Sequence, residues 1–268
     1  MTDLRLEGLT YRYPAGSVMA LREVDLAIGS GQRVAIIGQN GSGKSTLVRH
    51  LNGLLRPTSG RVRHDGEDVA HRTVAQLARS VGLVFQDPER QIFSGSVAAE
   101  VEFGPRNLGL RGAALQDAVS EALARVGLEA ARRTNPYDLG QSGRKLLTLA
   151  SVLAMRTPVL VLDEPTTGQD RRGTEIVRRV VATASAEGRT VIAISHDMEF
   201  VASTFDRVVV LGEGRVVLDG TPAEVFAEGA WEMLRATNLE PPLPALIGAR
   251  LGVGATPTIE ALVGALRA

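Results

Sequence analysis

A glycine-rich segment carries the residues whose types and spacing are best suited to phosphate chemistry. In order, its residues are Gly38, Gln39, Asn40, Gly41, Ser42, Gly43, Lys44, Ser45 and Thr46. It follows a short apolar run at residues 34–37, and a helical pattern begins where it ends. Glycines at this spacing let backbone N–H groups close around a β-phosphate, while Lys44 reaches toward the β- and γ-phosphates and the Ser45 hydroxyl can ligate Mg²⁺. A chance glycine-rich turn is the alternative, but the strand before it and the helix after it favour a nucleotide site.

Two adjacent carboxylates end another apolar run much further along the chain. Asp163 and Glu164 follow residues 159–162. Consecutive side chains at the end of a strand point in different directions, so the two acids can have separate tasks. Asp163 suits Mg²⁺, through water or through Ser45, and Glu164 suits orienting or deprotonating an attacking water. The alternative is that the two acids only cap the strand, which is the weaker interpretation because the sequence also contains a phosphate loop.

One histidine occupies a comparable position. His196 follows the apolar run at residues 191–194, at the edge where ligands collect in open α/β sheets. Its imidazole could donate a hydrogen bond to a γ-phosphate. A lone histidine is more often structural, and we expect His50, His64 and His71 on solvated faces or in loops.

The elements that position these groups are short apolar runs, at residues 34–37, 81–85, 159–162 and 191–194. Such runs are typical of strands that are buried on both faces, and helical patterns lie between them, so we predict a parallel α/β sheet. Residues 4–13 and a hairpin at 207–219 are expected to add antiparallel strands. The helix after the glycine-rich segment is expected to continue through Leu54 and Leu55 until Arg56-Pro57 stops it.

The remaining sequence divides into a sheet domain and a tail. Residues 90–156 read as mostly helical, with helices over 112–126 and 144–155, and we interpret them as a subdomain inserted into a domain of residues 1–220. Residues 221–268 are expected to form a small helical extension. It would hold one helix near 223–236, the proline cluster Pro241-Pro-Leu-Pro244, and a last helix from Thr258.

Composition narrows the classes of function. The 268 residues include 30 basic and 30 acidic side chains, which removes the electrostatic reason to expect a nucleic-acid partner. No apolar run reaches the roughly 18 residues that would cross a bilayer, and the N-terminal segment lacks the pattern of a secretory signal, so we expect no membrane span and no export. The absence of cysteine excludes disulfides and thiolate metal sites.

Taken together, the motifs resemble those of the ABC ATPase family over residues 3–220. The resemblance implies an α/β fold of the P-loop NTPase type, with a parallel sheet, an N-terminal antiparallel β part, an inserted helical subdomain and a small C-terminal extension. It also implies hydrolysis of ATP with Mg²⁺, with Lys44, Gln86, Glu164 and His196 as the catalytic set.

The same resemblance assigns roles to single residues. Tyr13 would stack on adenine, with Tyr11 as the other choice. Gln86 would contact Mg²⁺ or the attacking water and report nucleotide state to a membrane subunit. Asp170 would lie in the loop that communicates across the dimer, and His196 would be the γ-phosphate switch.

A finer resemblance is to the ATPases of energy-coupling factor (ECF) transporters, which take up vitamins and transition-metal ions. It rests on Gln86-Asp-Pro-Glu-Arg-Gln-Ile-Phe93, on residues 100–105 and on residues 107–110. In that family this region receives the coupling helices of a transmembrane T component, and a groove of Ile92, Phe93, Val97 and Phe103 could accept a helix. The alternative is that they are core residues, and for Phe103 both readings stay open.

The family's signature, Leu-Ser-Gly-Gly-Gln, is degenerate in this chain. Gly140 stands in place of the serine, Gln141 and Ser142 replace the two glycines, and Gly143 replaces the glutamine. The signature normally presents a hydroxyl and N–H groups to the γ-phosphate bound by the opposite subunit. The resemblance therefore favours a heterodimer with a second ATPase subunit whose signature is intact, with a homodimer as the other possibility.

The ECF resemblance further implies a T component and a substrate-binding membrane component as partners, and a peripheral position on the cytoplasmic face of the membrane. In place of an apolar residue, Gln169 precedes Asp170 in the dimer loop. The C-terminal extension resembles one that supports dimerisation in the ECF ATPases, although Pro241–Pro244 could be a passive linker and Trp231 a packing residue.

The alternatives to this function are another P-loop enzyme such as a small-molecule kinase, an ABC protein acting on DNA or ribosomes, a regulatory ATP-binding module, or a cassette of another importer or an exporter.

Overall fold

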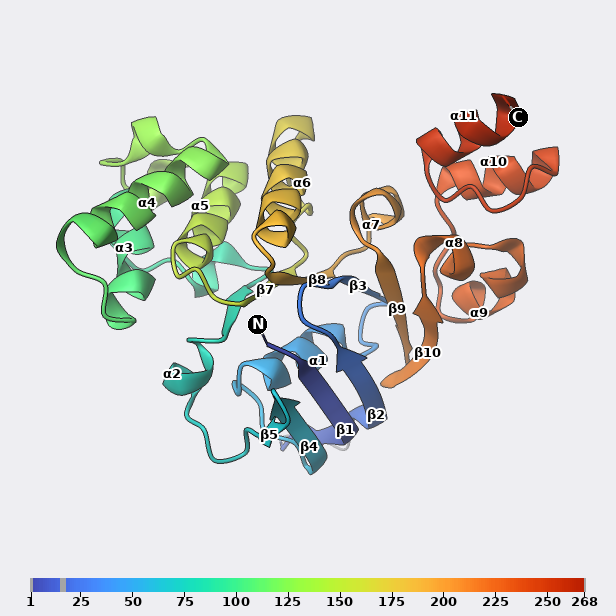
Figure 1. The fold of residues 1–268 in the computed structure, drawn as a ribbon, viewed down its shortest axis with the longest axis horizontal. Helices are drawn as coiled ribbons and strands as arrows, with labels where there is room; N and C mark the ends of the chain where they lie inside the picture. Colours follow the sequence, from blue (N-terminus) through green and yellow to red (C-terminus); the bar gives the residue numbers. More distant parts are fainter. Residues whose placement is uncertain (1, 15–17, 268) are drawn as a thin grey trace.

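The computed structural model of the protein describes residues 2–14 and 18–267. Its strands within those residues form two sheets, one antiparallel and one mostly parallel (Figure 1). The first sheet has the order β2 (Met19–Ile28), β1 (Leu4–Arg12), β4 (Ser59–His64), β5 (Glu67–Asp68). The second has the order β10 (Arg215–Gly220), β9 (Arg207–Gly212), β3 (Arg33–Ile37), β8 (Thr190–Ile194), β7 (Val159–Asp163), β6 (Val81–Val84). In the second sheet β10 is antiparallel to β9, and the other neighbouring pairs are parallel.

The helices connect and cover these strands. They are α1 (Lys44–Leu51), α2 (Val74–Leu77), α3 (Val97–Asn107), α4 (Gly112–Val126), α5 (Gln141–Leu153), α6 (Arg171–Ala186), α7 (Met198–Thr204), α8 (Pro222–Val225), α9 (Trp231–Ala236), α10 (Leu243–Leu251) and α11 (Ile259–Arg267). Short 3-10 turns occupy Pro88–Arg90, Glu129–Ala131, Pro136–Asp138 and Glu228–Ala230. None of the helices in the described part of the chain is long and apolar enough to span a bilayer.

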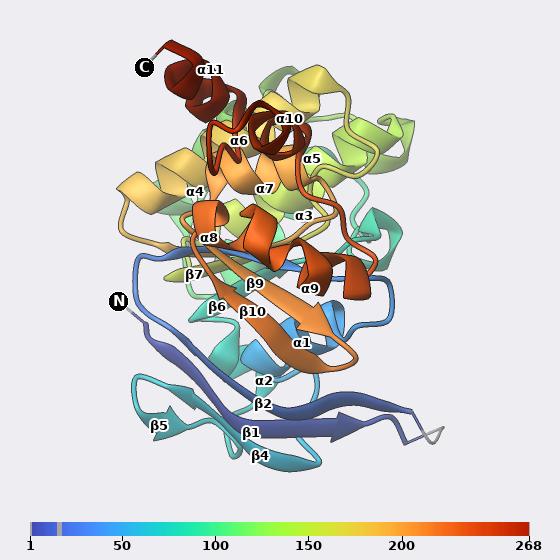
Figure 2. The same ribbon diagram turned by 90° about the vertical axis from the view of Figure 1, so that its right-hand side faces the viewer.

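Alternation along the parallel strands explains the layers. In β3, Val34 and Ile36 enter the core shared with α1 and the antiparallel sheet, whereas Ala35 and Ile37 enter the core on the opposite face. Figure 2 shows the resulting stack, with α6 and α7 on one side of the parallel sheet and α1 and the antiparallel sheet on the other. Because both faces are covered, the central residues of β3, β7 and β8 are apolar on both sides of the strand, as the sequence predicts for a parallel sheet, and polar residues stand only at the ends of these three strands.

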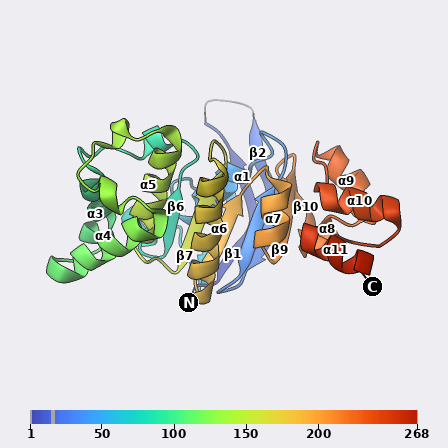
Figure 3. The same ribbon diagram turned by 90° about the horizontal axis from the view of Figure 1, so that it is seen from above.

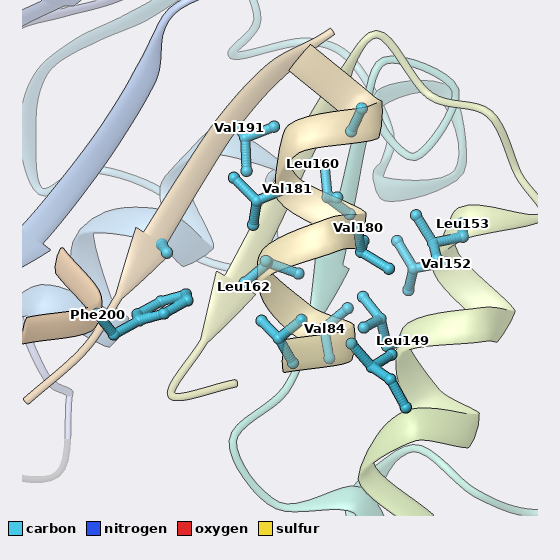
Figure 4. Packing of buried hydrophobic residues seen from close by; sticks show 14 of the residues in the cluster. Val84, Leu149, Val152, Leu153, Leu160, Leu162, Val180, Val181, Val191 and Phe200 are labelled. Carbon is cyan, nitrogen blue, oxygen red and sulfur yellow. The ribbon is translucent and has the colours of Figure 1, made fainter. Parts of the chain in front are cut away.

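Helix α6 forms much of the packing on one face of the sheet. Its Val180 and Val181 lie against Leu160 and Val191 of the strands beneath (Figure 4), and all four side chains are buried. These are apolar residues on one stripe of a helix, so burial of that stripe fixes α6 over β7 and β8.

The helical part and the tail lie at opposite ends of the molecule (Figure 3). Helices α3, α4 and α5 pack on one another at one end, where α4 spans the residues predicted for it and α5 starts slightly before its predicted beginning. Helices α8 to α11 lie at the other end, beyond β10. The sheet domain with α6 and α7 lies between them.

The prediction for the end of α1 is wrong. The helix ends at Leu51, so Leu54 and Leu55 lie outside it. The reason is local: Asn52 caps the helix and Gly53 adopts a left-handed backbone with φ of 73°, which stops it before the proline is reached.

The predicted tail is also wrong in two places. Residues 223–236 form the separate short helices α8 and α9, and the Trp231 indole N–H donates to the Phe226 carbonyl at the break between them. The second place is α10, which the sequence analysis did not predict: it begins within the proline cluster, with Pro242 at its N-cap, so the alternative of a passive linker is wrong. Proline fits the first turn of a helix because the N–H it lacks would have no partner there.

Two histidines are misplaced by the sequence reading. His50 and His64 are each only 1% exposed, in α1 and β4, whereas His71 is exposed as expected. The His50 ring packs edge-on against Tyr11 and its Nδ1 lies 2.8 Å from the Thr46 carbonyl. Both rings fill the space between α1 and the antiparallel sheet, which a residue-by-residue reading of polarity does not reveal.

Candidate nucleotide-binding site

The predicted site residues converge where the parallel strands end. The loop after β3, the carboxylates at the end of β7, and the residues after β6 and β8 all reach the same edge, because parallel strands share the direction of their C-terminal ends. They surround a cleft of about 370 Å³. Its lining residues are Tyr13, Val18, Ala20, Asn40, Gly41, Gly43, Lys44, Ser45, Thr46, Gln86, Asp163, Glu164, Ile194 and His196.

The loop after β3 needs glycine at its tightest points. Gly43, the N-cap of α1, has φ of 104°, and a Cβ there would lie 2.5 Å from the Ala20 carbonyl oxygen. Gly38 has φ of 152°, and a Cβ there would lie 2.3 Å from the Leu211 carbonyl oxygen. Both contacts are far too close for any other residue, so the glycines let the loop fold against neighbouring backbone.

Lys44 is turned back on this loop. Its Nζ donates to the carbonyls of Gly38 at 2.7 Å and Gln39 at 2.9 Å, and the side chain is largely buried. Burial lowers the pKa of Lys44, and the carboxylates of Glu164 and Asp163 oppose that shift. Its ammonium therefore lies close to two acids and at the edge of the cleft, where a bound anion would compete for it.

The two acids are buried side chains. Asp163 is 3% exposed and Glu164 is 4% exposed, and burial raises the pKa of both carboxyls. Asp163 Oδ1 has no hydrogen-bond partner among the described residues. A buried carboxylate oxygen without a partner is costly, and oxygen ligands of this kind suit a hydrated Mg²⁺. Together with the Ser45 hydroxyl and the Gln86 amide oxygen, the donor set fits that ion.

The Glu164 side chain is held between two neighbours. Thr167 donates from its Oγ1 to Glu164 Oε2 at 3.1 Å, and His196 Nε2 lies 3.2 Å from Glu164 Oε1, without hydrogen-bond geometry. Burial and the charge of Lys44 lower the pKa of His196, which favours the neutral ring. His196 is thus placed over the acid that is predicted to orient water.

The aromatic residues beside the cleft have different surroundings. Tyr13 is partly exposed and lines the cleft, and its hydroxyl lies 2.9 Å from Thr46 Oγ1. Tyr11 is buried and meets the Tyr13 ring edge-on at 4.9 Å. Only Tyr13 therefore offers ring surface to the cleft.

The signature residues lie apart from this cleft. Gly140, Gln141, Ser142 and Gly143 form the start of α5, and none of these described residues lines the cleft of their own chain. Gly140 is the N-cap and has no side chain to cap the helix. The separation is what a role toward another subunit requires.

Ser142 contacts the other unusual residue that the sequence shows. Its hydroxyl donates to Gln169 Oε1 at 2.5 Å, and Gln169 Nε2 approaches the Ser142 carbonyl at 3.4 Å. Next to it, Asp170 caps α6 by accepting from the Gly173 N–H at 2.7 Å. The altered signature and the altered dimer loop are therefore joined by their own side chains.

The sequence reading missed two residues that touch the site. Lys145 Nζ donates to the Glu164 carbonyl at 3.2 Å, and Asn238 Nδ2 donates to Gln39 Oε1 at 2.5 Å. The sequence signal for Lys145 is that mostly apolar residues, 146–153, directly follow it, so that a solvated side chain is out of place at its position. Nothing local marks Asn238, because its partner is distant in sequence.

Comparison with known proteins adds an independent finding. A family model described as ABC transporter matches residues 21–167, which include the glycine-rich loop and both carboxylates. The chain belongs to the ABC transporter family. It is also 40% identical, over 89% of its length and 76% of the relative's, to the energy-coupling factor transporter ATP-binding protein EcfA of Methanothermobacter thermautotrophicus.

Solved structures agree with this assignment. The fold matches cbiO1 from Clostridium perfringens, described as part of the ABC transporter complex cbiONQ, with a TM-score of 0.76, 39% identity, and coverage of 93% of this chain and 98% of that one. It also matches a dimeric post-hydrolysis state of the ATP-binding cassette MJ0796 bound to ADP and Pi, with a TM-score of 0.75, 26% identity, and coverage of 81% and 98%. The predicted family and fold class are confirmed. The chain is an ATP-hydrolysing subunit that powers a membrane transporter of the ECF type.

Proposed function

We propose that the cleft at the edge of the parallel sheet binds MgATP, with the glycine-rich loop around the phosphates and the Tyr13 ring against adenine. The observation that carries this proposal is the convergence on one cleft of side chains that follow three different strands: Lys44 after β3, the Asp163–Glu164 pair at the end of β7, and His196 after β8. Ser45, Gln86 and Asp163 would hold Mg²⁺. When bound, the ion would neutralise charge that develops on the phosphate oxygens.

Glu164 would orient or deprotonate the attacking water. Its carboxylate lines the cleft, and burial raises the pKa of this group, which makes it a better base than an exposed glutamate. His196, close to Glu164, would donate a hydrogen bond to the γ-phosphate. Lys44 would exchange its two loop carbonyls for phosphate oxygens, which are stronger acceptors because they are charged.

For the dimer we favour pairing with a second ATPase subunit that has an intact signature. The Ser142 hydroxyl is engaged by Gln169 within its own chain, which argues against its replacing the missing signature serine. Asp170, which caps α6 beside this contact, would lie in the loop that crosses the dimer. This chain's phosphate loop and acids would then work opposite the partner's signature, while the partner's nucleotide would face the altered one.

The membrane components would dock on the helical end of the chain, at the cytoplasmic face of the membrane. Phe93 and Phe103 are 61% and 50% exposed and meet edge-on at 4.7 Å, an aromatic pair left open on the surface. Ile92 and Val97 are buried, so the predicted groove is wrong for these two, and the core reading is wrong for Phe103. The transported solute would be a vitamin or a transition-metal ion, chosen by a separate membrane protein.

MgATP hydrolysis tests the proposal, measured for the chain alone and after co-expression with candidate ATPase and T-component partners. We expect activity with the second ATPase, and a Glu164→Gln variant of this chain should lower it by about 10²–10⁴-fold, the usual contribution of a general base. Rapid hydrolysis by the chain alone would contradict the heterodimer. Activity that survives Glu164→Gln unchanged, when the partner's own acid is also replaced, would contradict the assignment of the water-activating group.

A further inference from the structure

Lys145 is a buried cation that no motif predicts. It lies one turn into α5, is 9% exposed, and is followed by Leu146 and Leu147, which are also buried. Burial lowers the pKa of Lys145, while the charges of Glu164, Asp163 and Asp87 oppose that shift. A buried ammonium group is unfavourable unless hydrogen-bond acceptors or carboxylates lie close to it.

Its position relative to the acids is specific. Asp163 and Glu164 line the nucleotide cleft, which contains Lys44, and also a small cavity behind it, which contains Lys145. The two acids therefore lie between two lysines. Of these two lysines, only Lys44 lines the cleft that a nucleotide would fill. Lys145 can therefore affect the nucleotide only through the residues it contacts.

The contact that Lys145 makes is to the backbone of Glu164. That residue has φ of 52°, a left-handed conformation that is rare for a residue with a side chain. Its N–H donates to the Ile194 carbonyl at 3.0 Å, and its own carbonyl accepts from Lys145 Nζ at 3.2 Å. Such a conformation persists when the surroundings hold it on several sides, and these two bonds hold the peptide groups on either side of the Glu164 Cα.

We propose that Lys145 is a positioning residue for ATP hydrolysis: its ammonium holds the Glu164 backbone so that the carboxylate faces the cleft. The inference rests on the proposed role of Glu164. It also links the start of α5, where the altered signature lies, to the acid of the same chain, because Gln141 and Lys145 are one helical turn apart.

A Lys145→Met variant separates positioning from a purely structural role. Methionine keeps the length and apolar stem of the side chain and removes the charge, and an apolar replacement of a buried charge is often neutral or stabilising. We expect an unchanged or higher melting temperature, a KM for ATP within about twofold, and a kcat lower by between about tenfold and 10²-fold, the size of effect that a small misplacement of a reacting group has. Lys145→Arg, which keeps the charge, should recover part of the kcat.

The control is Ser151→Ala on the same helix, where a buried hydroxyl bonds to the Leu147 carbonyl and is remote from the acids. It should leave kcat unchanged. All variants are compared in the ATPase dimer that hydrolyses ATP, with binding of a fluorescent ATP analogue as a second readout. An unchanged kcat in Lys145→Met would overturn the proposal. So would a lower kcat that is accompanied by a lower melting temperature and weaker nucleotide binding, because that combination indicates a purely structural role. Glu164→Gln is measured in parallel. If the proposed function of Glu164 is wrong, this variant also retains its kcat; if only the proposal for Lys145 is wrong, Glu164→Gln still loses kcat.

Discussion

At the scale of single residues, burial decides the behaviour of groups that the sequence can only name. The acids and His196 could be predicted because they stand at or just after the end of an apolar run, and Lys44 because it ends the glycine-rich loop that follows such a run, so their position in the chain fixes their position at the sheet edge. The buried histidines could not, because polarity alone suggests exposure, whereas Lys145 has a local signal in the apolar residues that directly follow it. The surroundings of the histidines come from elements that are distant in sequence.

The buried histidines predict a loss of stability in mild acid. The pKa values of His50 and His64 lie below the ordinary 6.5, chiefly because the two rings are buried. In mild acid the folded protein therefore binds fewer protons at these residues than the unfolded chain does. Their contribution is therefore fully present above about pH 6.5 and is lost as the pH falls through the folded pKa values. The free energy of urea unfolding should be lower at about pH 5 than at about pH 8.

A variant pair assigns this effect to the buried rings. His64→Gln cannot become charged, so the difference in unfolding free energy between the two pH values should shrink. His71→Gln, at an exposed position, should leave the difference as it is in the unmodified protein. An identical pH difference in all three proteins would contradict a role for His64.

At the scale of elements, the strands were easier to predict than the ends of the helices. Strands buried on both faces appear as short apolar runs, and β3, β6, β7 and β8 lie within or next to those runs. Helix ends depend on backbone groups that periodicity does not report. Gly53 ends α1, and Pro242 begins α10, through local conformations that compete with the helical pattern.

The contact between the start of α5 and the loop before α6 gives a prediction about stability. Because Ser142 and Gln169 bond to each other through side chain and backbone, replacing either one should remove the same contact. We expect Ser142→Ala and Gln169→Leu each to lower the unfolding free energy by about 0.5–1.5 kcal/mol, the usual net value of a hydrogen bond. The double variant should lose less than the sum, with a coupling of about 0.5 kcal/mol or more.

The control for that coupling is Ser142→Ala combined with Ser203→Ala, whose hydroxyl bonds to the Glu199 carbonyl within α7. These two changes share no partner and should be additive. Additivity in the Ser142 and Gln169 pair as well would show that the two unusual residues are independent in solution. The altered signature would then not be tied to the dimer loop.

At the scale of the whole molecule, the tail is not separate from the phosphate-binding loop. Leu234 and Leu239 are buried on either side of Asn238, which adopts a left-handed backbone with φ of 54°. The Asn238 amide thereby reaches Gln39, a residue of the loop. Gln39 in turn accepts from Lys44 through its carbonyl, so one chain of contacts joins the end of α9 to the lysine.

This connection predicts that the tail affects nucleotide binding. Asn238→Ala should weaken binding of a fluorescent ATP analogue by about two- to tenfold, because a net hydrogen bond of about 0.5–1.5 kcal/mol corresponds to that range of Kd. Gln39→Ala should have a similar effect, and the double variant should be no weaker than either single one. Glu232→Ala, a change at an exposed position of α9, the helix that precedes Asn238, is the control and should bind like the unmodified protein. If Asn238→Ala binds as tightly as that control, the loop holds its conformation without the tail, and the sheet domain alone sets the affinity for ATP.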